Sequence, residues 1–120
     1  MDESVTLSVQ RERHAVALAG DLEHVVEQLS SIPAVQKVIL FGSYAAGRRD
    51  LFTDLDLLVI MDSPLSFVPR NVELARRVRA GVALDLLAYT PREMEQMRGR
   101  RFLRHALETG KVLYEKRPSQ

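Results

Sequence analysis

The chain has 120 residues, of which 46% are hydrophobic and 28% charged, and its formal net charge is +1. This balance is typical of one globular domain, and the near-neutral charge argues against a general nucleic-acid binder. The absence of cysteine excludes disulfides, thiolate catalysis and cysteine-based zinc sites. No basic-then-apolar leader and no apolar run of about 20 residues is visible, so we expect a cytoplasmic protein without a membrane span.

The first third of the chain predicts a short strand, a helix and a second strand. Apolar and polar residues alternate over Val5–Val9, which predicts a short strand. Apolar residues then recur at helical spacing from Leu18 to Ile32, and Pro33 marks the end of this helix. Residues Val35–Phe41 predict a strand that Gly42-Ser43 interrupts, and the residues after this break can form about one helical turn.

The middle of the chain predicts two strands joined by a helix. Asp54–Ile60 and Val82–Tyr89 are rich in branched apolar residues and predict strands. Asn71–Ala80 predicts a helix that Gly81 terminates, after a proline-containing loop. The inward residues of this helix are expected to be Val72, Ala75 and Val78, with Leu74 as a further candidate, while the other face carries Arg70, Arg76, Arg77 and Arg79.

The last third predicts two helices and a closing strand. Thr90 is expected to cap a helix that contains Met94 and Met97, with Glu93 completing a capping box. Residues 100–110 predict another helix and Lys111–Glu115 a strand. The whole chain is therefore expected to form a single α/β (α+β) domain, residues 1–120, in which helices flank a small mixed β-sheet.

Two carboxylates stand at the start of one predicted strand. Residues i and i+2 of a strand share a face, so Asp54 and Asp56 project together. Like charges this close raise each other's proton affinity, and a divalent cation relieves that repulsion. The pair is therefore a candidate Mg²⁺ site, since Mg²⁺ binds one or two carboxylates together with water and substrate phosphates.

A third carboxylate, Asp85, interrupts the apolar strand Val82–Tyr89. A strand this apolar is expected to be buried on both faces, where an unpaired carboxylate would be costly. If this strand lies beside the previous one, Asp85 joins Asp54 and Asp56. Three carboxylates can hold two Mg²⁺ ions about 4 Å apart, as in phosphoryl and nucleotidyl transfer.

Gly42 and Ser43 have the chemistry of a phosphate-binding turn. Glycine lets backbone N–H groups approach a phosphate closely, and the serine hydroxyl can donate to a phosphate oxygen. A short helix after the turn would direct its positive end at the same anion. The three aspartates are thus expected to hold metal ions, and the metal ions a nucleoside triphosphate.

These motifs resemble the signature of the polymerase-beta-like nucleotidyltransferase superfamily. Gly42-Ser43, ten spacer residues and Asp54-Leu55-Asp56, with Asp85 on a later strand, look most like its minimal nucleotidyltransferases over residues 35–89. The resemblance implies two Mg²⁺ ions on the aspartates, ATP as substrate, and transfer of AMP to an acceptor hydroxyl. Minimal members often act as antitoxins that modify a HEPN-domain toxin, commonly on a tyrosine.

Several residues near the signature have two interpretations. Antitoxins of this group often have an arginine where this chain has Ala46, and Arg48 and Arg49 follow just after. Arg48 is a candidate phosphate ligand, although a charged loop residue is more often only solvated. Tyr44 could stack on a base or pack in the core. The histidines, His14, His24 and His105, are expected at the surface or at an interface, and the arginine face of the middle helix is either solvated or a surface for a partner or RNA.

Two other functions stay open from the sequence. The chain could neutralise a partner by binding alone, or it could modify a small molecule of the aminoglycoside type as a dimer. The chain is short for a separate acceptor-binding domain, so we expect the acceptor from another protein, such as a HEPN-domain partner, or from a second subunit. A nucleic-acid partner is not expected.

Overall fold

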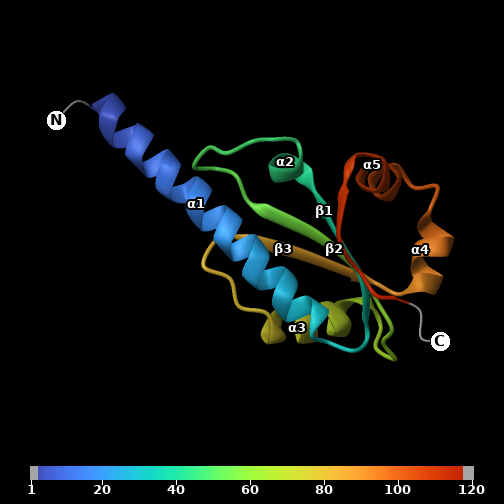
Figure 1. Cartoon of the computed structure of the whole chain (residues 1–120). Helices are drawn as coiled ribbons and strands as arrows, with labels where there is room; N and C mark the ends of the chain where they lie inside the picture. The colour runs from blue at the N-terminus through green and yellow to red at the C-terminus, as the bar shows by residue number, and fades with distance from the viewer. Residues whose placement is uncertain (1–2, 118–120) are drawn as a thin grey trace.

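The structure, a computed structural model, describes residues 3–117 and contains one mixed four-stranded sheet (Figure 1). The strands are β1 (Val35–Phe41), β2 (Leu55–Met61), β3 (Leu84–Tyr89) and β4 (Lys111–Glu115), and their order across the sheet is β3-β2-β1-β4. Strand β1 is antiparallel to both β2 and β4, whereas β2 and β3 are parallel. The expected small mixed sheet is therefore confirmed, and β3 lies beside β2.

Helices cover both faces of the sheet. They are α1 (Glu3–Ser30), α2 (Gly42–Ala45), α3 (Phe67–Arg77), α4 (Pro91–Met97) and α5 (Arg101–Thr109). Leu55, Leu57 and Val59 of β2 pack with residues of α1 and α3, while Leu58 packs on the opposite face with Leu103 of α5. Because side chains alternate along a strand, Asp56 shares the α4/α5 face with Leu58.

Helix α1 is longer than the sequence pattern predicts. It includes the segment Val5–Val9, so the prediction of a short strand there is wrong. Alternation over only five residues is a weak signal, and no proline separates this segment from the strong helical pattern that begins at Leu18. The helix would span about 42 Å, and its N-terminal half projects beyond the sheet, with residues 6–13 exposed (Figure 1). Neither α1 nor any other helix within residues 3–117 is apolar and long enough to cross a membrane.

Helix α3 begins four residues before its predicted start and ends before Gly81. It runs from Phe67 to Arg77, and Pro69 lies in its first turn, where a proline is tolerated because no helical N–H is lost. The side chains that point inward also differ from the expected set. Leu74 and Val78 are buried as expected, but Val72 and Ala75 are exposed.

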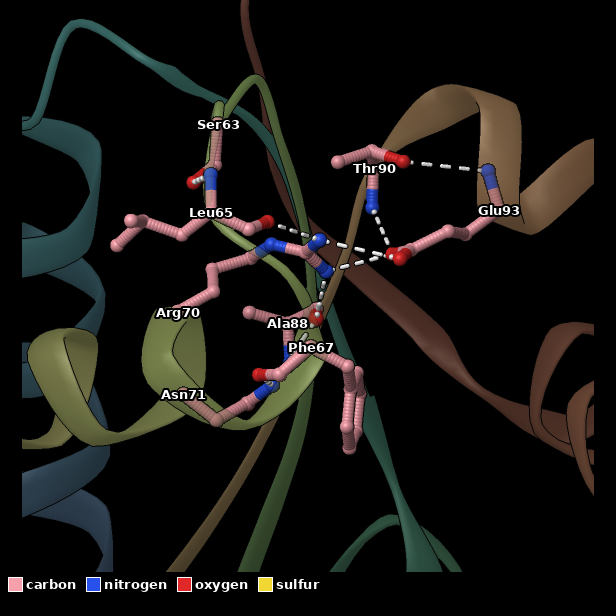
Figure 2. A network of polar contacts seen from close by, with 8 residues as sticks. All are labelled: Ser63, Leu65, Phe67, Arg70, Asn71, Ala88, Thr90 and Glu93. Carbon is pink, nitrogen blue, oxygen red and sulfur yellow. Dashed lines mark hydrogen bonds and ion pairs between the residues drawn. The ribbon is translucent and has the colours of Figure 1, made fainter.

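Arg70 is buried, so its predicted place on a solvated arginine face is wrong. Only 3% of the residue is exposed, and its guanidinium donates to both Glu93 carboxylate oxygens, at 2.5 and 3.0 Å (Figure 2). It also donates to the main-chain oxygens of Leu65 and Ala88. The contacts join α3, the loop after β2, the end of β3 and α4 into one network.

The end of β3 continues into the predicted capping box. Thr90 accepts from the Glu93 N–H, and the Glu93 carboxylate accepts from the Thr90 N–H (Figure 2). Glu93 therefore serves the helix cap and the Arg70 pair together, and the second role was not visible in the sequence. Met94 and Met97 of α4 are half-buried and pack against the core cluster on this face of the sheet.

Candidate active site

One end of the sheet, here called the carboxylate edge, brings together the start of β2, the start of β3 and the end of β1. Asp56 is in register with Asp85 on one side and with Phe41 on the other. Asp56 and Asp85 are each the second residue of their strand, and because β2 and β3 are parallel and in register, the two residues lie side by side. Both carboxylates project on the α4/α5 face, because they alternate with the residues that pack under α1 and α3.

Gly42 brings the Gly-Ser turn directly against Asp56. Its φ is +77°, a left-handed conformation that glycine adopts without steric cost. A Cβ atom at this position would overlap the Asp56 carboxylate. The sequence therefore needs glycine here for two independent reasons, and Ser43 follows in the first turn of α2.

At this edge the carboxylates of Asp54, Asp56 and Asp85 repel one another, and no paired cation among the described residues balances their charge. Burial raises the pKa of Asp56 to about 6, and a hydrogen bond with Asp85 and the charges of Asp85 and Asp54 act in the same direction. Within residues 3–117, none of the three aspartates forms an ion pair with a lysine, arginine or histidine. The site therefore favours either a proton or a bound cation.

Asp85 differs from the expectation in its surroundings. Its strand was expected to be buried on both faces, and this is wrong, because β3 is an edge strand and Asp85 is exposed. Only the end of the strand, at Ala88 and Tyr89, is fully buried, and its leucines are half-buried. The carboxylate is thus open to solvent at the rim of the site, where an incoming molecule can reach it.

The donor chemistry of the edge suits Mg²⁺, although the cluster is not closed. In the described part of the chain, no group of three or more His, Cys, Asp or Glu side chains is close enough to hold a metal ion without other ligands. Asp56 and Asp85 form the close pair, and Asp54 acts on Asp56 through its charge. Two carboxylates and further oxygen ligands from substrate phosphates are a usual environment for Mg²⁺.

The loop between α2 and β2 is organised by Asp50, a residue that the sequence analysis did not single out. Its carboxylate accepts from the Phe52 N–H at 2.9 Å and from the Thr53 hydroxyl at 3.3 Å. His14 of α1 lies 3.1 Å from the Thr53 carbonyl oxygen. These contacts fix the residue that precedes Asp54, and an aspartate followed three residues later by threonine was the local signal for such a turn.

The two arginines of this loop already have contacts in the protein. Arg48 pairs with Asp50 at 2.5 Å, which raises the pKa of Arg48 and lowers that of Asp50. Arg49 lies over the Tyr44 ring, 3.5 Å from its centroid, and donates to the Tyr44 carbonyl. Tyr44 is buried in the core, so it packs rather than offering a free face to a base. Arg48 stays a predicted phosphate ligand, and it would have to exchange Asp50 for the phosphate.

Comparison with known proteins identifies the family of the chain. The family profile described as "Nucleotidyltransferase domain" matches residues 22–115, which is most of the chain. Over 82 residues, 67% of this chain and 79% of the relative, the sequence is 30% identical to the "Putative protein adenylyltransferase MJ0604" of Methanocaldococcus jannaschii.

Two solved structures share the fold. A crystal structure of a nucleotidyltransferase, titled putative, from Sulfolobus solfataricus superposes with a TM-score of 0.62 at 17% identity, covering 88% of this chain and 87% of that one. A chain from a mutant of the toxin-antitoxin MntA-HpeT superposes with a TM-score of 0.51 at 22% identity, covering 80% and 73%. The matched profile, the mixed sheet and the carboxylates beside the Gly-Ser turn lead to one conclusion: the chain belongs to the nucleotidyltransferase domain family and is a nucleotidyltransferase.

Proposed function

We propose that this enzyme transfers AMP from ATP to a hydroxyl group on a partner protein, with Mg²⁺ as cofactor. The observation that carries the proposal is the register of Asp56 and Asp85 beside Gly42, in a chain of the nucleotidyltransferase family. Support for a protein acceptor comes from the relative named as a putative protein adenylyltransferase. Gly42, Ser43 and Arg48 are the proposed nucleotide ligands, and Asp54, Asp56 and Asp85 the proposed metal ligands.

The reaction would be an in-line displacement at the α-phosphorus of ATP. The acceptor hydroxyl oxygen forms a bond to that phosphorus, and the bond from phosphorus to the α–β bridging oxygen breaks, so pyrophosphate leaves. The Gly42-Ser43 turn holds the β- and γ-phosphates through N–H groups and the serine hydroxyl. The carboxylate of Asp85, which is exposed, would accept the proton of the acceptor hydroxyl.

Mg²⁺ would neutralise the charge that develops on the phosphoryl oxygens and would relieve the repulsion among the aspartates. The open carboxylate cluster suits a metal ion that enters with the nucleotide, since the phosphates complete its ligands. We propose two such ions, as the resemblance implies. Asp54 and Asp56 would contact both, and Asp85 the one on the acceptor side.

The proposed partner is a HEPN-domain toxin, which the enzyme would neutralise by adenylylation. One solved structure with this fold comes from a toxin-antitoxin pair, and the motif resembles the antitoxins of HEPN systems. If the chain acted by binding alone, nothing would relieve the repulsion among the three aspartates. A nucleotide bound with its metal ion would relieve it. The cytoplasmic location remains a prediction from the sequence.

The experiment is transfer of label from α-³²P-ATP with Mg²⁺ to the proteins of a host lysate. Wild type, Asp56→Asn and Asp62→Asn are compared, because Asp62 is an exposed aspartate directly after the other end of β2. The proposal predicts a labelled protein band with wild type and with Asp62→Asn, and none with Asp56→Asn. Label on RNA alone would assign a different acceptor, and the same band from all three proteins would reject the mechanism.

A further inference from the structure

A cavity of about 510 Å³ lies between α2 and α5, directly beside the Gly-Ser turn. Figure 1 shows α2 and α5 next to each other at the end of β1. Gly42 and Ser43 form one side, and Phe102 and His105 of α5 form the other. The volume falls within the range of about 300–1,000 Å³ that is common for small-molecule sites.

The cavity is continuous with the proposed phosphate site, since Gly42 and Ser43 line both. A nucleotide whose phosphates rest on this turn therefore has its remaining part, the nucleoside, within reach of the cavity. Phe41 also lines the cavity and is the register neighbour of Asp56. The cavity thus adjoins the carboxylates on the α4/α5 face of the sheet.

The chemistry of the cavity walls suits a flat aromatic ligand. Phe102 is 48% exposed, and its ring meets Phe41 edge-on, at 5.5 Å between centroids and 86° between planes. Among the described residues this is the one ring contact of Phe102, and nearly half of the residue is open to solvent, so its ring is available to a ligand. Bases stack on aromatic rings with little dependence on sequence.

Small and polar side chains complete the walls. Ala46, exposed at the end of α2, leaves the cavity open on the side opposite Phe102. The His105 ring has no hydrogen-bond partner within residues 3–117, and the imidazole can donate to or accept from the edge of a base. A few polar groups in a mostly apolar wall are the usual composition of a ligand pocket.

We propose that this cavity is the nucleobase subsite, in which the base of the bound nucleoside triphosphate stacks on Phe102 and hydrogen-bonds to His105. The inference rests on the proposed function for the position of the phosphates. It adds that α5, far along the sequence from the Asp-Leu-Asp motif, determines how tightly the enzyme distinguishes a nucleotide from a bare polyphosphate.

The test is equilibrium binding of ATP and of inorganic tripolyphosphate, each with Mg²⁺, to purified full-length protein. Phe102→Ala is expected to weaken ATP binding about tenfold and to leave tripolyphosphate binding unchanged. Phe102→Tyr, which keeps an aromatic face, should bind ATP as wild type does. Phe52→Ala is the matched control, because Phe52 is 82% exposed and does not line the cavity.

Ala46→Leu gives an independent second variant, since it fills the cavity from α2 and does not alter α5. It is also expected to weaken ATP and not tripolyphosphate. The nucleobase subsite would be overturned if the two variants lost affinity for ATP and for tripolyphosphate equally. It would also be overturned if they bound both ligands as tightly as wild type does. Wild-type protein that binds neither ligand would instead overturn the proposed function, and the nucleobase subsite with it.

Discussion

Charged side chains lie at both ends of the strand pair β2 and β3, and the two ends differ in whether those charges have partners. At the start of the strands, Asp56 and Asp85 face each other without a cation. At the far end, the charged guanidinium of Arg70 donates hydrogen bonds to Glu93 and to two carbonyl oxygens (Figure 2). The completed end joins elements of the fold, and the incomplete end has room for a ligand to complete it.

This difference also appears in the direction of the pKa shifts. Arg70 holds the pKa of Glu93 below its usual value, so that carboxylate stabilises the fold above its unfolded-state pKa. The pKa of Asp56 is raised to about 6, so its ionised form destabilises the protein without ligand. At one end of this strand pair a carboxylate of α4 thus stabilises the fold, and at the other end a carboxylate of β2 destabilises it.

Removing a charge at the incomplete end should have the largest effect on activity. We expect Asp85→Asn to reduce AMP transfer about a thousandfold, because proton acceptance and charge neutralisation at the reacting phosphate both depend on it. The fold should persist, since Asp85 is exposed. Initial rates of label transfer measure the effect, with Asp62→Asn as the control. A loss below about tenfold would contradict a catalytic role for Asp85.

The close contact between the turn and the carboxylate can be tested with two glycines. Gly42 and Gly47 both have positive φ, but a Cβ atom overlaps Asp56 at Gly42 and meets nothing within 4 Å at Gly47. We expect both alanine variants to lose about 1–2 kcal/mol of unfolding free energy from backbone strain. Only Gly42→Ala should also lose transfer activity, by about a hundredfold. Equal activity in the two variants would show that the contact with Asp56 is unimportant.

At the completed end, breaking the pair should lower stability and leave the chemistry unchanged. Glu93→Ala leaves the buried Arg70 guanidinium short of its carboxylate and removes half of the capping box. We expect a loss of about 2–4 kcal/mol in unfolding free energy, measured by urea denaturation. Glu95→Ala is the control on the same helix, since its pair with Arg98 is exposed and should contribute less than about 0.5 kcal/mol. Folded Glu93→Ala protein should transfer AMP at the wild-type rate.

The smallest expected effect is a gain in stability when the strained carboxylate is neutralised. Without ligand, Asp56→Asn should be more stable than wild type by about 1 kcal/mol at pH 7.5, a value reduced for solvent screening of a partly exposed group. The folded-state pKa is the higher one, so this difference should grow between about pH 4 and pH 6 and stay level above. Unfolding curves at pH 4, 6 and 7.5 measure it. An Asp56→Asn variant that is less stable than wild type at pH 7.5 would show that ionised Asp56 does not destabilise the fold.

Features with a local pattern could be predicted from the sequence. The run of branched apolar residues in β2 and the Gly-Ser break after β1 predicted the strands that meet at the site, and the spacing of Thr90 and Glu93 predicted the capping box. The sequence left open whether β3 lies beside β2, the condition for Asp85 to join Asp56, and the structure shows that it does. The roles of the aspartates in catalysis stay predictions.

Features that depend on distant contacts could not be predicted. Arg70 is buried because Glu93, 23 residues later, approaches it, and no pattern within α3 reveals that partner. The cavity beside Gly42 depends on α5, which follows some 60 residues later. The N-terminal half of α1 was missed for the opposite reason, because its exposed residues have no core-facing pattern to read.

The parallel pairing of β2 and β3 has a consequence for protein engineering. The spacing between Asp56 and Asp85 is determined by the hydrogen-bond ladder of the sheet rather than by the connection between the strands. The segment before β3 is itself anchored on α1, because the N–H group of Arg79 donates to Gln28 and those of Gly81 and Val82 donate to Asp21. A reporter peptide is therefore best inserted after Ala80, an exposed residue between these anchored positions, where lengthening the connection costs about 0.6 kcal/mol for each doubling of loop length and keeps the carboxylate spacing intact.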